Sequence, residues 1–207
     1  MDIVKPPLAA SAAPRSLILT TTWEREDNPH FCGPASARIA LSALLASPPT
    51  QADIGAFLDW DHLGNCDTEV CPDDVRDLAH VAAALDHYLD TDRYEPTYLS
   101  DPPTDEEQAE LARRVVDGIT AGFPLVAFVY GPGSDEPFAF CPPFYPADGP
   151  PHHFITVIGY EDGGAAAVIS DSASGDDERD RWGDFPETYS IPIADFAKWI
   201  GYHGYAG

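Results

Sequence analysis

The chain has 207 residues, and its 11 Lys and Arg against 35 Asp and Glu give a formal net charge of −24. A chain this acidic repels phosphate backbones and anionic lipid, which excludes nucleic acid and a membrane surface as electrostatic partners. The length and the 44% hydrophobic content indicate a globular protein. We expect a flexible arm at residues 1–16 and a single domain over residues 17–207. Because the arm lacks the continuous apolar core of a secretory signal, we also expect a cytoplasmic protein.

The first half of the chain is predicted to be mainly helical. Residues 16–23 favour a strand, and residues 24–30 form a polar turn. Apolar side chains at three- and four-residue spacings then predict a helix over residues 33–47, which two prolines end. Thr50, with Asp53 three residues later, predicts a short capped helix that runs through residue 58. The same periodicity and acidic first turns predict further helices over residues 72–87 and 104–121.

The second half is predicted to be mainly strands. Residues 125–130 (LVAFVY) read as a buried strand, and residues 131–151 are too rich in proline to form a regular element. That segment is interleaved with aromatic residues and is either a lid or specificity wall, or a packed surface loop. Further along, a hairpin of residues 153–160 and 165–170, a strand at 188–191 and a helix at 193–200 are expected. Helices followed by antiparallel strands make an α+β fold.

Cys32 lies where a polar loop turns into the first predicted helix, in the run Phe-Cys-Gly-Pro-Ala-Ser. The N-terminus of a helix carries a partial positive charge and unpaired backbone amides, which favour a thiolate. Gly33 allows another backbone to approach closely. The position therefore suits a nucleophile, although an inert core cysteine would also fit, because free cysteines are often buried.

A thiolate nucleophile needs a base and a group that orients the base, and these are usually distant in sequence. His153 begins one strand of the predicted hairpin, and Asp171 ends the other. Because the start of one antiparallel strand lies beside the end of the next, their side chains can meet at one edge. The alternative is two solvated strand ends. His152 points to the opposite face and is expected at the rim.

Together the runs FCGPASARIALSAL, HHFITVIGYED and VISDSASG resemble the C39-like branch of the papain-like cysteine peptidases. The resemblance implies a papain-like cysteine peptidase fold, with N-terminal helices followed by an antiparallel sheet. It also implies that Cys32 is the nucleophile, that His153 is the general base and acid, and that Asp171 orients the imidazole. No metal or organic cofactor is implied.

One position departs from that family. The family has a glutamine about six residues before the cysteine, whose amide donates a hydrogen bond to the oxyanion, and here that residue is Glu26. An ionised carboxylate has no proton to donate and repels an oxyanion. Asn28 carries a suitable amide but is displaced by two residues. We favour Asn28 or a shifted loop over a protonated Glu26 as the oxyanion donor.

The leading hypothesis is a hydrolase that cleaves a peptide or amide bond through an acyl-thioester on Cys32, and the acidic surface favours a cationic peptide as substrate. Two alternatives stay open: an acyl or peptidyl transferase that uses the same thioester, and an inactive acidic module that binds peptides. Cys66 and Cys71 are spaced more widely than the ligands of a structural zinc site, which favours a reversible disulfide or plain thiols. Cys141 is expected to be structural, and residues 176–180 to form a solvated acidic loop.

Overall fold

A computed structural model describes residues 13–28, 30–58, 78–131, 133–135, 140–145, 152–175 and 185–207. Several features predicted above lie outside these residues: most of the arm, both cysteines of the pair Cys66 and Cys71, and the acidic loop at residues 176–180. None of the described helices is long and apolar enough to span a membrane.

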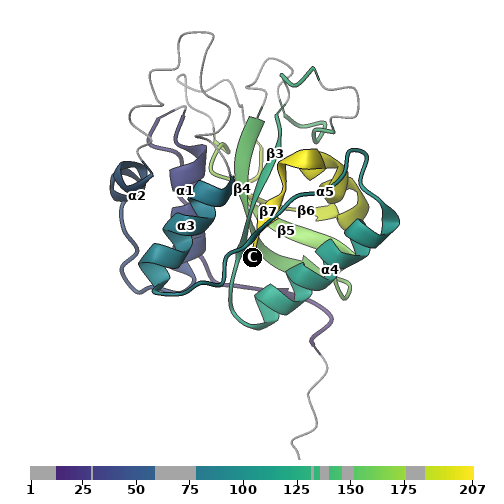
Figure 1. Cartoon of the computed structure of the whole chain (residues 1–207), viewed down its shortest axis with the longest axis horizontal. Coiled ribbons are helices and arrows are strands. Elements are labelled where there is room, and N and C mark those ends of the chain that lie inside the picture. Colours follow the sequence, from purple (N-terminus) through teal and green to yellow (C-terminus); the bar gives the residue numbers. More distant parts are fainter. Residues whose placement is uncertain are drawn as a thin grey trace, which may run out of the picture.

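An antiparallel sheet forms the centre of the molecule (Figure 1). Its strand order is β2 (Pro96–Thr97), β7 (Tyr205–Ala206), β3 (Leu125–Tyr130), β4 (His152–Glu161), β5 (Ala166–Ser170) and β6 (Thr188–Pro192). A further short strand, β1 (Leu17–Ile18), pairs with Gly159 and Tyr160 near the C-terminal end of β4. The structure thus combines helices with an antiparallel sheet, as the order of predicted elements indicates.

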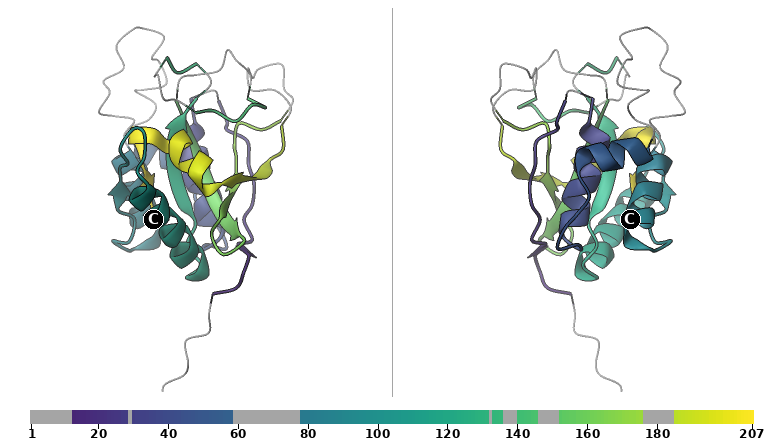
Figure 2. Two further views of the ribbon diagram at one scale, coloured as in Figure 1. Left: turned by 90° about the vertical axis from the view of Figure 1, so that its right-hand side faces the viewer. Right: turned by 90° about the vertical axis from the view of Figure 1, so that its left-hand side faces the viewer.

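Helices cover both faces of this sheet (Figure 2). On one side lie α1 (Cys32–Ser42), α2 (Gln51–Phe57) and α3 (Leu78–Leu89), and on the other lie α4 (Asp105–Thr120) and α5 (Ile193–Ile200). Because neighbouring residues of a strand face opposite ways, β3 and β4 supply both cores. Val126 and Phe154 belong to the core beneath α1 and α3, whereas Ala127 and Ile155 belong to the core beneath α4 and α5.

The predicted cap of α2 is present, and α4 begins with a cap of the same kind. Thr50 and Asp53 form a capping box at the start of α2, and Thr104 and Glu107 form one at the start of α4. In each box the threonine hydroxyl accepts from a backbone amide of the first turn, and the carboxylate accepts from the backbone amide of the threonine. Hydrogen bonds from Ser100 and Thr104 lower the pKa of the Glu107 carboxyl to about 2.

The helix α1 ends about one turn earlier than the prediction of residues 33–47. The Ser42 hydroxyl donates to the Ile39 carbonyl at 2.6 Å and accepts from the backbone amide of Thr22 at 2.8 Å. A serine side chain that bonds the backbone locally competes with the helical ladder. The next amide, of Ala43, accordingly bonds the carbonyl three residues back, which tightens and closes the helix.

The hairpin of β4 and β5 turns at Asp162, Gly163 and Gly164, which all have positive φ angles. Thr156 of β4 pairs with Ser170 of β5, so the beginning of β4 and the residue after β5 lie at the same end of the sheet. The sequence did not reveal β2 and β7, because two-residue strands carry no periodic pattern. These strands are defined by what they pair with: β7 pairs with both β2 and β3.

Candidate active site

Cys32 is the first residue of α1, and a hydrogen-bonded turn leads into it. The Asn28 side-chain oxygen accepts from the His30 amide at 2.9 Å, and the Asn28 carbonyl accepts from the Phe31 amide at 3.0 Å. Phe31 then serves as the N-cap, and its side chain makes no capping hydrogen bond. The thiol thus lies at the positive end of an 11-residue helix that has no acidic residue in its first turn.

A reciprocal pair of buried hydrogen bonds locks α1 onto β4. The Ser36 hydroxyl donates to the Phe154 carbonyl, and the Thr156 hydroxyl donates to the Ser36 carbonyl, each at 2.9 Å. Ser36 follows Cys32 by one helical turn, and Phe154 follows His153 directly. The two bonds therefore fix the position of the Cys32 backbone relative to that of His153.

His153 and Asp171 meet as the hairpin geometry predicts. The His153 Nε2 atom lies 2.8 Å from the Asp171 Oδ1 atom, and the side chains are 1% and 0% exposed. Two further bonds hold the Asp171 backbone: its amide donates to the Glu187 carbonyl at 3.0 Å, and its carbonyl accepts from the Trp23 indole at 2.7 Å. The carboxylate is thus presented to the imidazole by a backbone fixed from two sides.

Cys32 lies close enough to the same imidazole to raise its pKa. Because Nε2 faces Asp171, the ring nitrogen available to the thiol is Nδ1, which is also buried. Burial alone would lower the pKa of His153, but the Asp171 charge, the hydrogen bond to Asp171 and the nearby Cys32 raise it well above its ordinary value. The structure therefore brings the three predicted residues together, in the order thiol, imidazole and carboxylate.

Two tyrosines that the sequence did not single out complete the surroundings of Asp171. The hydroxyls of Tyr145 and Tyr189 both donate to Asp171 Oδ2, the latter at 2.7 Å, and the Ala173 amide donates to Oδ1 at 3.0 Å. Burial would raise the pKa of the Asp171 carboxyl, but His153 and the two tyrosine hydroxyls lower it below its ordinary value. The aromatic run before His153 was visible in the sequence, but nothing in it marked which ring reaches the carboxylate.

The loop that carries Glu26 is tied to its surroundings by backbone contacts. The buried side chain of Gln51 bonds the backbone on both sides of Glu26. Its Oε1 atom accepts from the Asp27 amide at 2.9 Å, and its Nε2 atom donates to the Arg25 carbonyl at 2.7 Å. The Glu26 amide donates to the carbonyl of Ser172, next to Asp171, at 3.3 Å. Both carboxylate oxygens of Glu26 are buried. The sequence did not single out Gln51, which is recognisable from its bonds to this loop.

His152 is exposed and lies on the other side of β4 from His153. Its ring centroid lies 5.5 Å from that of Phe128 and 4.6 Å from that of His203. Cys141 is half-buried, and burial together with the Asp171 charge raises the pKa of its thiol to about 12. A thiol with that pKa stays protonated near neutral pH and is a poor nucleophile.

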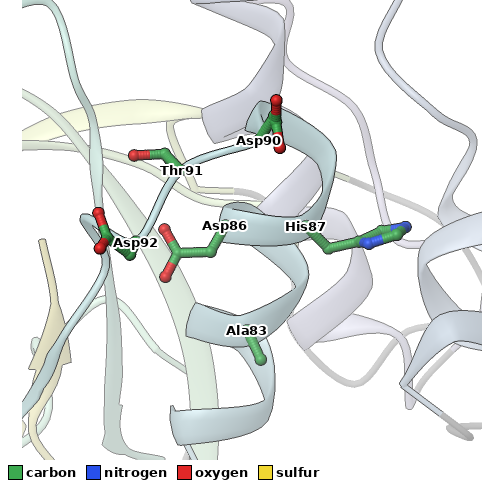
Figure 3. A pocket seen from close by; sticks show the side chains of 6 residues that line it. All are labelled: Ala83, Asp86, His87, Asp90, Thr91 and Asp92. Carbon is green, nitrogen blue, oxygen red and sulfur yellow. The ribbon is translucent and has the colours of Figure 1, made fainter.

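A separate open pocket of about 580 Å³ lies at the end of α3, and none of the residues discussed above lines it (Figure 3). Asp86 Oδ1 accepts from the backbone amides of Arg93 and Tyr94. The role of this carboxylate is therefore structural, because it holds the turn that follows the helix. The His87 side chain points away from Asp86 (Figure 3). Across the described ranges, no group of three or more His, Cys, Asp or Glu residues could hold a metal ion.

Comparison with known proteins gives a family and a fold. The model of the Peptidase_C39 like family matches residues 19–192. A crystal structure from Bacillus anthracis, named as a C39-like peptidase, superposes with a TM-score of 0.51 and 14% sequence identity, and the match covers 93% of this chain and 97% of that chain. At that identity, the likeness speaks for the fold alone. No curated protein matches the sequence.

Proposed function

Because the chain belongs to the Peptidase_C39 like family, we propose that it is a cysteine peptidase that hydrolyses a peptide or amide bond through an acyl-thioester on Cys32. The observation that supports this most is the buried hydrogen bond between His153 and Asp171 beside Cys32, which lies at a helix N-terminus. An N-terminal helix with the thiol, packed on an antiparallel sheet with the imidazole and carboxylate, further supports a papain-like fold over residues 17–207.

In the proposed mechanism, His153 Nδ1 takes the Cys32 proton, and the thiolate attacks the carbonyl carbon of the scissile bond. The tetrahedral intermediate collapses as His153 returns the proton to the leaving amine, which leaves the acyl group on sulfur. His153 then takes a proton from water, the hydroxide attacks the thioester, and the acid product leaves as the thiol re-forms. In every step Asp171 bonds the Nε2 atom of His153, so the Nδ1 atom of His153 stays directed at the Cys32 sulfur.

Stabilisation of the oxyanion is the unusual part of this mechanism. The backbone amides at the start of α1 are suited to it, because they point at the region next to Cys32. The Glu26 carboxylate, six residues before Cys32, opposes a developing negative charge when it is ionised. The Asn28 side-chain oxygen is used by the His30 amide, which leaves the amide group of Asn28 as the neutral donor of this loop.

Replacing Glu26 with glutamine is expected to raise kcat for peptide cleavage about tenfold or more, because the amide donates where the carboxylate repels, and one such donor is worth about 100-fold to 1000-fold. The measurement is steady-state cleavage of one peptide by E26Q and the unaltered chain. Asp27→Asn is the matched control, since it removes the same charge from the exposed neighbour. Equal rates for E26Q and D27N would show that Glu26 does not face the oxyanion, and a large loss in Asn28→Ala would then identify Asn28 as the donor.

We propose a cationic peptide as the substrate class, on the strength of the net charge of −24. The test is a panel of matched peptides with Lys and Arg, neutral, or Glu residues around the scissile bond, with products weighed by mass spectrometry at low and high salt. Cleavage of the cationic peptides should be fastest and should fall as salt rises. No salt dependence would exclude the electrostatic preference, and products joined to an added amine would identify a transferase instead of a hydrolase.

A further inference from the structure

The Asp171 carboxylate makes four hydrogen bonds although its side chain is fully buried. Oδ1 faces His153 Nε2 and the Ala173 amide, and Oδ2 accepts from the hydroxyls of Tyr145 and Tyr189. An ionised carboxylate offers about four lone-pair sites, so every one of them is used here. A buried charge with fewer donors would be expected to take up a proton.

The two tyrosines come from segments that are distant in sequence from Asp171 and from each other. Tyr145 ends the described segment 140–145 between β3 and β4, and Tyr189 lies on β6. Their hydroxyl oxygens are 3.1 Å apart. The Tyr145 ring packs against Phe185 at 4.9 Å and against Trp199 at 5.5 Å between centroids. These contacts fix the direction in which the Tyr145 hydroxyl points.

The chemistry of a phenol makes it a selective partner for the charged form of a carboxyl group. A hydroxyl that donates to a carboxylate stabilises the ionised form, whereas a protonated carboxyl has less need of the donor. Burial and the Asp171 charge raise the pKa of both tyrosines well above the ordinary value, so both keep their protons near neutral pH. Cys141, the other titratable group that faces Asp171 and Tyr189, is neutral there as well.

We infer that Tyr145 and Tyr189 are positioning residues that keep Asp171 ionised and aimed at His153, and so favour transfer of the Cys32 proton to His153. This inference rests on the proposed function, because it concerns the same thiol. An ionised Asp171 stabilises a positive His153, and a positive His153 stabilises a negative Cys32. The tyrosines act on the sulfur only through this chain, and neither is needed to touch the substrate.

The experiment compares Tyr145→Phe, Tyr189→Phe and the double variant with the unaltered chain. Each change removes one hydroxyl and leaves the ring. The measurement is the rate of Cys32 alkylation by iodoacetamide as a function of pH, read by mass spectrometry of the Cys32 peptide. The midpoint should rise by about one pH unit in the double variant and by less in each single one, because a hydrogen bond to a charged group favours that form about tenfold or more.

Tyr160→Phe is the matched control, because Tyr160 is another buried tyrosine whose hydroxyl bonds a carbonyl, that of Pro14, away from the thiol. The inference predicts an unchanged midpoint for this variant. If the Tyr145 and Tyr189 variants keep the midpoint of the unaltered chain, or if Tyr160→Phe moves it equally, the inference is overturned. Circular dichroism spectra and unfolding curves of each variant show that the comparison is between folded proteins.

A second readout does not depend on the reactivity of Cys32. In a Cys32→Ser background, NMR titration of His153 reports its pKa directly, and this pKa should fall by about one unit when both tyrosine hydroxyls are removed. An unchanged His153 pKa contradicts the inference. If instead Cys32 of the unaltered chain reacts no faster than Cys141 while the His153 pKa still responds to the tyrosines, it is the proposed function that fails.

Discussion

Replacement of Cys32 with alanine is expected to lower kcat/KM for peptide cleavage by about four to six orders of magnitude, the loss that follows removal of a nucleophile from a hydrolase of this kind. The variant keeps His153 and Asp171 but has no atom that can form the acyl intermediate. Binding of the peptide should change little, because the thiol contributes chemistry and only a small area of contact. The measurement is cleavage of the fastest peptide of the panel, followed over hours.

Cys141→Ala is the control for this change. Cys141 is also a free, half-buried cysteine near Asp171, but burial raises the pKa of its thiol to about 12. The C141A variant should therefore keep nearly full activity. In the unaltered chain, Cys141 should be alkylated far more slowly than Cys32 at neutral pH. Equal activities of C32A and C141A would remove Cys32 from the mechanism. A peptide that C32A still binds but no variant cleaves would support the inactive peptide-binding module.

The three residues proposed for catalysis were predictable because local rules place them. A cysteine at a polar-to-apolar boundary followed by helical periodicity has to lie near a helix start, which the bounds of α1 confirm. His153 and Asp171 are brought together by hairpin register, which depends on a short turn and on alternation along the strands. The capping boxes of α2 and α4 were predictable for the same reason, since their partners are three residues apart.

What the sequence did not reveal depends on contacts between distant segments. Tyr145 and Tyr189 reach Asp171 from 26 and 18 residues away, and a loop of prolines and aromatics gives no register from which to predict which ring points inward. Gln51 stands in the first turn of a short helix like any solvated residue, and only its bonds to the Glu26 loop distinguish it. The early end of α1 similarly depends on Thr22, which lies outside the helix.

Replacement of Asp171 with alanine is expected to cost about three to four orders of magnitude in kcat/KM, because the imidazole then loses the group that fixes its orientation. The same change leaves the hydroxyls of Tyr145 and Tyr189 and the Ala173 amide without their acceptor. Each buried donor left without a partner costs about 1–3 kcal/mol, so the free energy of unfolding should fall as well. That deficit should shrink on acidification through the pKa of Asp171, which lies below its ordinary 3.8, because the unaltered chain then loses the charge too.

Asp171→Asn separates the two contributions of this residue, its shape and its charge. The asparagine oxygen can still accept from His153 Nε2, while its amide group donates to the tyrosine hydroxyls, so the imidazole keeps its orientation but no longer faces a negative charge. We expect a loss of about 10-fold to 100-fold, with the alkylation midpoint of Cys32 moved to higher pH. Asp101→Asn is the matched control, since Asp101 also accepts from a tyrosine, Tyr130, at another place in the fold.

The ratio between the two Asp171 variants decides what the carboxylate does. If D171N and D171A are equally impaired, the negative charge carries the effect, and the tyrosines matter because they keep that charge in place. If D171N is nearly fully active and its alkylation midpoint is unchanged, residue 171 contributes only by orienting the imidazole, and its negative charge is not needed. An intermediate D171N with a shifted midpoint means that both contribute, and the size of the shift then measures the coupling from Asp171 through His153 to the Cys32 sulfur.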